Sequence, residues 1–191
     1  MTTPDSASTP AAGAGDLRLL YRSYSYLHDT PLIAASRTAA ILHAPDATWL
    51  RARLADELDE LAGVAAGTHY HAGLPDDAIL EASQVCYWTF VTAVAARLSY
   101  AELCPHECLL EATVISPQQA AALGVILAQG VRGGMGFVPP SDLRAALRQV
   151  GATCRALKIP PTVGPAYDLA QMRARPYMAA FFAAALDSAS A

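Results

Sequence analysis

The chain is poor in charge and especially in lysine, and these shortages exclude several classes of protein. Charged residues make up only 16% of the 191 residues, and Lys158 is the only lysine. With 13 basic against 17 acidic residues, the chain lacks the basic surface with which nucleic-acid-binding proteins contact phosphate. The four cysteines are predicted to be free thiols and not a disulfide framework: Cys86, Cys104, Cys108 and Cys154.

Long uninterrupted apolar runs and a secretion signal are also missing. Every apolar stretch of membrane-spanning length contains a carboxylate, a glycine or a proline, and the N-terminus has no basic segment followed by an apolar one. We therefore expect a cytoplasmic protein that is neither secreted nor membrane-bound. Hydrophobic residues make up 53% of the chain, which is enough for the core of one domain of ordinary size.

Strand signals are scarce, whereas helix signals recur along the chain. Alanine is frequent, β-branched runs are short, and neither Asn-Gly nor Asp-Gly occurs. Capping residues and prolines predict helices over about 31–43, 47–66, 77–99, 117–129, 141–158 and 166–187, the last of which must bend or restart near Pro176. We predict an all-α helical bundle with a disordered tail (1–16), a helical core (17–115) and a helical C-terminal extension packed on that core (116–191).

The predicted helix 47–66 carries a dense group of acidic residues beside an apolar stripe. Asp56, Glu57, Asp59 and Glu60 fall within five positions. Glu57 lies about 60° and Glu60 about 120° from the centre of the leucine stripe, on the same side, so their carboxylates are neighbours. Asp59 lies on the opposite flank, towards solvent. Neighbouring like charges repel, so the run is either a solvated acidic face or a binding site.

The next predicted helix contains a single charged residue, Glu81, between positions 78 and 96. A helix that is apolar all round is central and buried, so this carboxylate must be paired, protonated or bound to a metal. Gln84 lies one turn further on the same face. Because a loop of about ten residues joins the two helices, we expect them to pack antiparallel and to bring Glu57 and Glu60 opposite Glu81 and Gln84. Such oxygen ligands suit Mg²⁺ or Mn²⁺ and not zinc.

These two helices resemble a known family. The segments Arg53-Leu54-Ala55-Asp56-Glu57-Leu58-Asp59-Glu60 and Glu81-Ala82-Ser83-Gln84 are similar to the E-E-x-x-E and E-x-x-D halves of a signature. That signature belongs to the all-α nucleoside triphosphate pyrophosphohydrolases, which include MazG-type enzymes and phosphoribosyl-ATP pyrophosphohydrolase. The resemblance covers about residues 50–97 and implies that the helical core 17–115 is MazG-like. Position 84 departs from the family pattern, because Gln replaces Asp and removes one negative charge.

The resemblance implies an Mg²⁺-dependent (or Mn²⁺-dependent) hydrolase that acts on the phosphoanhydride of a nucleotide or a related phosphorylated metabolite, and it implies a homodimer. The implied metal ligands are Glu57, Glu60, Glu81 and Gln84, of which the three glutamates are also the catalytic residues. The implied substrate-binding residues are Arg53, Gln84, Trp88, His69 and His71. Gln84 leaves an alternative open: a catalytically altered member of the fold that binds a small ligand or a partner protein, or a helical enzyme repurposed for specialised metabolism.

The histidines of the loop between the two acidic helices allow further interpretations. His69 and His71 are either exposed loop residues or contacts of a substrate phosphate. A zinc site that combines them with Cys104 and Cys108 is disfavoured, because this spacing matches no strong zinc motif. Pro105 instead indicates the first turn of a helix that points Cys108 into the core.

Overall fold

The computed structural model describes residues 12–187, and every regular element in this range is a helix. The predicted all-α fold is therefore confirmed. The elements are α1 (Ala14–Asp29), α2 (Arg37–His43), α3 (Ala47–Ala66), α4 (Asp76–Ala95), α5 (Tyr100–Leu103), α6 (Pro105–Leu110), α7 (Pro117–Gly133), α8 (Pro140–Ala156), α9 (Val163–Arg173), a 3₁₀ turn (Pro176–Met178) and α10 (Ala179–Asp187).

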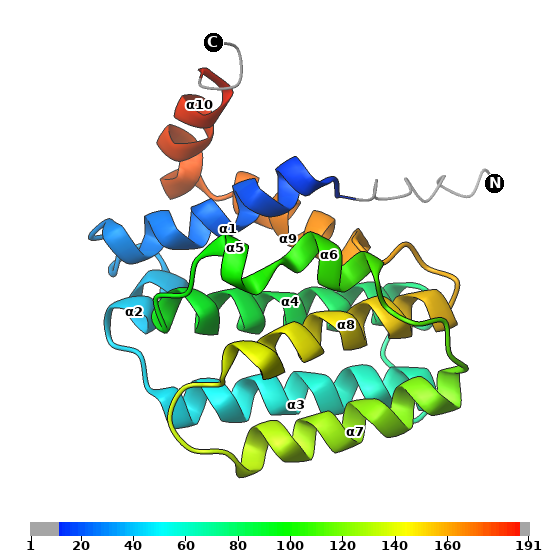
Figure 1. Cartoon of the computed structure of the whole chain (residues 1–191). Helices are drawn as coiled ribbons and strands as arrows, with labels where there is room; N and C mark the ends of the chain where they lie inside the picture. The colour runs from blue at the N-terminus through cyan, green and yellow to red at the C-terminus, as the bar shows by residue number, and fades with distance from the viewer. Residues whose placement is uncertain (1–11, 188–191) are drawn as a thin grey trace, which may run out of the picture.

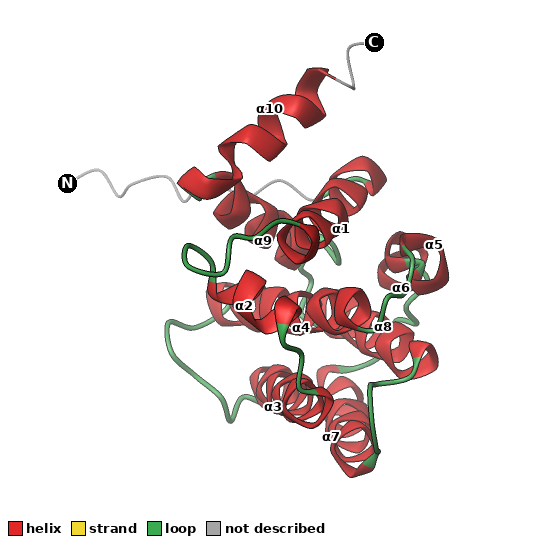
Figure 2. Cartoon of the chain, turned by 90° about the vertical axis from the view of Figure 1, so that its left-hand side faces the viewer, coloured by secondary structure: helices red, strands yellow, loops and turns green. Residues whose placement is uncertain are grey.

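The helices form three layers (Figures 1 and 2). Helices α3 and α7 pack together on one side, α4 and α8 lie in the middle, and α1 and α9 cover the opposite side. Helix α4 thus contacts α3, α8 and α9. Buried residues before and after position 116 belong to the same hydrophobic core. Helix α10 projects beyond the layers at the C-terminal end of the chain.

Several helix ends lie where the sequence places them. Asp46 accepts hydrogen bonds from the backbone N–H groups of Thr48 (2.9 Å) and Trp49 (3.1 Å), and Gly67 ends α3 in the left-handed conformation at φ 74°. Ser116 forms a capping box with Gln119 at the start of α7, where the predicted helix 117–129 begins. The last predicted helix is interrupted after Arg173 and restarts at Pro176. These positions were predictable because caps act within one turn of the chain.

The N-terminal boundaries differ from the prediction. The predicted disordered tail 1–16 lies mostly outside the described residues, but α1 already begins at Ala14. The predicted helix 31–43 is wrong in its first half. Thr30 is the C-cap of α1, and α2 begins only after Ser36, whose hydroxyl accepts a hydrogen bond from Ala39 N–H at 3.2 Å. Pro31 follows the end of α1, where a proline stops a helix as readily as it starts one.

Helices α4 and α7 also end at unpredicted positions. Helix α4 ends at Ala95 and not near residue 99, and Arg97 just beyond it has a positive φ of 60°. Helix α7 continues to Gly133 although its last turn is rich in glycine. The reason is Arg51 of α3, which is only 3% exposed and donates from Nη1 to the carbonyl of Val131 at 2.7 Å. The α7 terminus is therefore held by a residue far away in the sequence.

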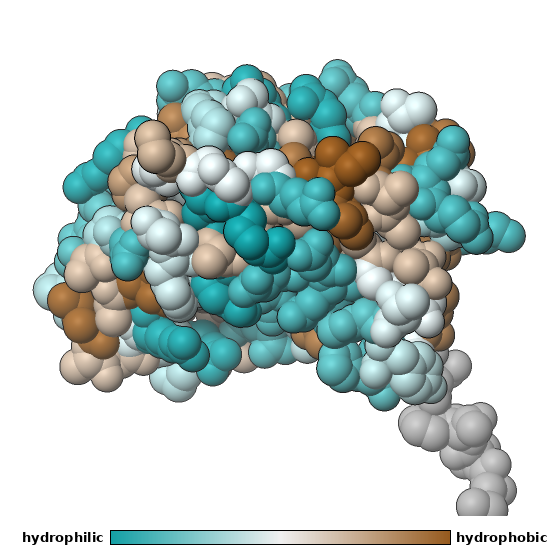
Figure 3. Space-filling model, turned by 90° about the horizontal axis from the view of Figure 1, so that it is seen from below, coloured by the Kyte–Doolittle hydropathy of each residue, from teal (hydrophilic) through white to brown (hydrophobic). Residues whose placement is uncertain are grey.

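Helix α4 has the length and composition to cross a membrane, and among residues 12–187 it is alone in this. However, 78% of its apolar window is buried inside the molecule, which is the pattern of the core helix of a soluble protein. The face formed by α3 and α7 is largely hydrophilic across its centre, with hydrophobic patches towards its edges (Figure 3).

Candidate metal centre and ligand pocket

Three glutamates from α3 and α4 converge as the sequence predicts. One carboxylate oxygen each of Glu57, Glu60 and Glu81 lies within 4.8 Å of the others. Further along α4, Trp88 Nε1 donates to Glu57 Oε1 at 3.2 Å, so residue numbers fall along α3 as they rise along α4. The two helices therefore pack antiparallel.

Burial disfavours the charged forms of Glu57 and Glu81. The residues Glu57 and Glu81 are 3% and 2% exposed, and Glu60 is half-buried. Burial raises the pKa of Glu57 to about 7, although the neighbouring Arg53 charge opposes the rise. Burial, followed by the charge of Glu60, raises the pKa of Glu81. A bound cation would relieve both effects, because it offsets the repulsion and replaces lost hydration.

The acidic run of α3 divides between two environments. Asp56 and Asp59 accept hydrogen bonds from Arg132 of α7 at 3.1 and 2.8 Å, at the protein surface. Glu57 and Glu60 line a cavity. The interpretation as a solvated acidic face therefore holds for Asp56 and Asp59, whereas the interpretation of Glu57 and Glu60 as a binding site stays a prediction.

Arg53 and Trp88 surround Glu57. The Arg53 guanidinium forms an ion pair with Glu57, lies 3.4 Å from Asp56, and sits over the Trp88 ring at 5.3 Å from its centroid. Trp49 packs edge-on against Trp88, with ring centroids 5.2 Å apart. These contacts fix the orientation of Glu57 and occupy its Oε1 atom, which leaves Oε2 for a ligand.

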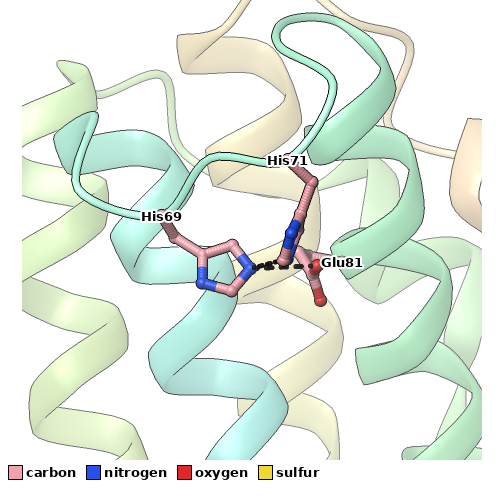
Figure 4. A group of neighbouring side chains, drawn as sticks. All are labelled: His69, His71 and Glu81. Carbon is pink, nitrogen blue, oxygen red and sulfur yellow. Dashed lines mark hydrogen bonds and ion pairs between the residues drawn. The ribbon is translucent and has the colours of Figure 1, made fainter.

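The loop after α3 brings two histidines to the same carboxylates (Figure 4). His69 Nε2 lies 3.3 Å from Glu81 Oε1 and 4.0 Å from Glu60 Oε2. His71 Nε2 lies 2.9 Å from His69 Nε2. The sequence predicted either free loop histidines or phosphate contacts, and it did not predict that their nitrogens would face Glu81. Among the described residues, neither Cys104 nor Cys108 joins these histidines in a group of possible metal ligands, and both thiols donate to nearby backbone carbonyls.

Two residues shape this loop. The buried Asp77 carboxylate accepts the backbone N–H groups of Ala72 (2.8 Å), His71 (3.0 Å) and Gly73 (2.9 Å), which lower its pKa. Gly63 leaves room for the loop, since a Cβ at this position would lie 2.8 Å from the Cβ of His69. Asp77, the first residue of the predicted helix 77–99, is thus the residue that folds the loop back.

A cavity of about 890 Å³ opens beside the glutamates, between α2, α3, α4 and α9. Its lining includes three arginines and four large aromatic residues: Arg37, Arg53, Arg175, Trp49, Tyr87, Trp88 and Tyr167. Gln84 also lines the cavity, half-buried and with no hydrogen-bond partner for its amide within residues 12–187. The predicted residues Arg53, Gln84, Trp88 and His71 therefore share one pocket with the three glutamates.

The far wall of the cavity was not predicted. It comes from α9 and the turn after it, with Asp168, Gln171 and Arg175 as polar members. Their spacing places them on one side of a helix, and this polar stripe is the feature of the sequence that could have indicated the cavity wall. The hydroxyl of Tyr24 donates to Asp168, and burial raises the pKa of Asp168 to about 7. Nothing local indicates that α9 packs against α4.

Comparisons with known protein families, with curated proteins and with solved structures give no match to this chain. The resemblance to the pyrophosphohydrolases therefore stays a prediction. The interpretation of the site depends on its own chemistry: clustered carboxylates, the His71 imidazole, arginines and aromatic rings around one cavity.

Proposed function

We propose that this protein is a divalent-cation-dependent hydrolase of the phosphoanhydride in a nucleotide or a related phosphorylated metabolite. The observation that supports this most directly is the cluster of Glu57, Glu60 and Glu81 in the lining of a cavity that also carries arginines. Carboxylate oxygens are the ligands that Mg²⁺ and Mn²⁺ prefer, and guanidinium groups bind phosphate oxygens in pairs.

The rest of the cavity suits a phosphorylated ligand with a flat ring. Its volume of about 890 Å³ falls within the range of small-molecule sites. Arg37 and Arg175 form no ion pair or side-chain hydrogen bond with the rest of the described chain, so their charges are available to phosphate. The aromatic residues Trp49, Tyr87 and Tyr167 offer ring faces or edges for stacking.

Each glutamate has a role in this proposal. The three carboxylates hold the cation, which neutralises phosphate charge and activates a water molecule when it is bound. Arg53 and the Trp88 N–H group keep Glu57 in position through its Oε1 atom. Glu60 is the most exposed of the three, so its second oxygen is best placed to accept a hydrogen bond from the attacking water.

Gln84 supports a second candidate function, which is ligand binding without hydrolysis. Its amide lines the cavity and has no partner in the described part of the protein. A neutral amide can donate a hydrogen bond to a ligand, whereas it adds no negative charge to the cation site. A catalytically altered member of the fold, which binds a small ligand or a partner protein, or a repurposed helical enzyme would retain the cavity and lose the pyrophosphohydrolase reaction.

An assay with matched variants tests the proposal. Purified protein is incubated with nucleoside di- and triphosphates, with Mg²⁺, with Mn²⁺ or with chelator, and released phosphate and pyrophosphate are measured. We expect metal-dependent release that Glu81→Gln abolishes. Asp59→Asn removes an equal charge from the surface of α3 and should retain activity. No release with any nucleotide, or full activity in Glu81→Gln, would refute the hydrolase; ligand-induced thermal stabilisation without release would favour the second candidate.

We further propose a cytoplasmic homodimer. Cys86, Cys108 and Cys154 are buried free thiols, which suits a reducing compartment. The exposed side of α7 carries Leu123 and Ile126, which are 49% and 64% exposed and lie one turn apart. A second copy of the chain would cover this apolar surface.

A further inference from the structure

The two loop histidines and Glu81 form a donor group that differs in chemistry from the carboxylate cluster. His69 Nε2 faces both His71 Nε2 (2.9 Å) and Glu81 Oε1 (3.3 Å), as Figure 4 shows. A neutral imidazole carries one N–H group, so His69 Nε2 cannot donate to both neighbours at once. The three atoms therefore lie close together without a complete set of hydrogen bonds.

Their spacing matches the spacing of ligands around one metal ion. Two ligand atoms at about 2.1 Å from a metal are about 3.0 Å apart in octahedral and about 3.4 Å apart in tetrahedral geometry. The separations of 2.9 Å for His69–His71 and 3.3 Å for His69–Glu81 fall close to these values. One atom from each of the three residues lies within 4.8 Å of the others.

The surroundings of Glu81 also favour a bound metal ion. Its side chain is 3% exposed, and within residues 12–187 its only ion-pair partner is His69, with no arginine or lysine in reach. A buried carboxylate without a permanent cation is costly. The loop that carries the histidines is held in place by the three backbone hydrogen bonds to Asp77. The missing side chain at Gly63 allows this loop to pack closely against α3.

We propose that His69 Nε2, His71 Nε2 and Glu81 Oε1 bind a first-row transition metal ion. Of Zn²⁺, Co²⁺ and Mg²⁺, Zn²⁺ should bind most tightly. Two imidazoles and one carboxylate form the donor set of many catalytic transition-metal sites, and nitrogen ligands favour such ions over Mg²⁺. Glu81 also belongs to the cluster with Glu57 and Glu60, so it lies between this ion and the proposed hard-cation site. A role of this ion in hydrolysis rests on the proposed function. Binding of the ion by the three residues does not rest on it.

Calorimetric titration of the full chain with Zn²⁺ alone and with Mg²⁺ alone separates the two sites. We expect His71→Ala to weaken Zn²⁺ binding by more than about 100-fold, since even outer partners of metal ligands cost 10–100-fold, and to leave Mg²⁺ affinity unchanged. Glu60→Gln should weaken Mg²⁺ binding and spare Zn²⁺. His71 is exposed, so its loss should not prevent folding. Unchanged Zn²⁺ affinity in His71→Ala would overturn the proposal.

Two histidine variants serve as controls for zinc bound elsewhere. The other histidines could also bind zinc: the His28 and His43 rings stack with their centroids 6.1 Å apart, and His106 lies two residues from Cys104. We expect His43→Ala and His106→Ala to retain Zn²⁺ binding; its loss in either variant would place the metal outside the proposed site and overturn the inference. Co²⁺ bound in place of Zn²⁺ should give a visible absorption band that disappears in His71→Ala. Intact Zn²⁺ binding without phosphate release would refute the hydrolase alone, and release without Zn²⁺ binding would refute this inference alone.

Discussion

Replacement of the buried Arg51 by methionine tests the long-range contact that ends α7. The guanidinium donates to four backbone carbonyls: Val131 at 2.7 Å, Met135 and Phe137 at 2.9 Å, and Gly136 at 3.0 and 3.2 Å. Arg51 has no carboxylate partner in the described chain, so these carbonyls alone satisfy its donors. Arg51→Met retains most of the apolar stem and removes every donor.

The size of the effect follows from the environment of the four acceptors. A hydrogen bond to a charged group contributes about 1.5–3 kcal/mol. Met135, Gly136 and Phe137 are exposed, so water can replace most of the hydrogen bonds that their carbonyls lose with Arg51. Val131 is buried and has no such replacement. We therefore expect a loss of about 2–4 kcal/mol in the free energy of unfolding and a Tm lower by roughly 5–15 °C.

Urea unfolding followed by far-ultraviolet circular dichroism measures this loss. Arg148→Met is the matched control, because Arg148 is exposed on α8 and its replacement should change stability by less than about 0.5 kcal/mol. Gly134→Ala tests the same contact from the other side: its φ of −75° suits any residue, but the added Cβ would lie 2.3 Å from Arg51 Nη1. A stability of Arg51→Met within about 0.5 kcal/mol of the natural chain would refute the reasoning.

Three further outcomes are expected. Burial raises the pKa of Asp168 to about 7, so the protonated carboxyl stabilises the fold below about pH 4, and this stabilisation is lost as the pH rises to 7. The Asp168→Asn side chain stays neutral and can still accept a hydrogen bond from Tyr24. Its free energy of unfolding should therefore exceed that of the natural chain by about 1–2 kcal/mol between pH 5 and pH 8. Gln84→Asp should tighten Mg²⁺ binding by about tenfold in a hydrolase, because it adds a charge to the site, whereas weaker binding of an organic ligand with no metal response would favour the second candidate. Light scattering at micromolar concentration should give the mass of a dimer, and Ile126→Glu should give a monomer; a monomeric natural chain would contradict the proposed dimer.

The parts of the fold that the sequence predicts correctly depend on short-range interactions. Asp46, Gly67 and Ser116 act on neighbours within one turn, so the ends that they specify are visible in the residue order. Glu57, Glu60 and Glu81 were found because helical periodicity and one short loop determine which faces meet.

The parts that escaped prediction depend on contacts between distant segments. Arg51 meets the end of α7 across 80 residues of chain, and Arg175 reaches the cavity only because α9 packs on α4. The approach of His69 to Glu81 depends on the space at Gly63 and on the bonds to Asp77, and no spacing rule describes that combination. The predicted helix 31–43 assumed Thr30 as its N-cap, whereas Ser36 is the N-cap of α2; both residue types are acceptable caps, and a local rule cannot choose between them.

The candidate ligands for metal ions all lie within residues 57–84, on one helical hairpin, whereas the opposite wall of the cavity comes from α2 and α9. The two halves of the pocket can therefore change independently during evolution. Substitutions at Arg37, Tyr167 or Arg175 would alter the ligand preference of the cavity without disturbing the residues proposed to bind a cation. A protein that shares the hairpin sequence need not share the ligand, and α2 and α9 are the place to look for differences in specificity.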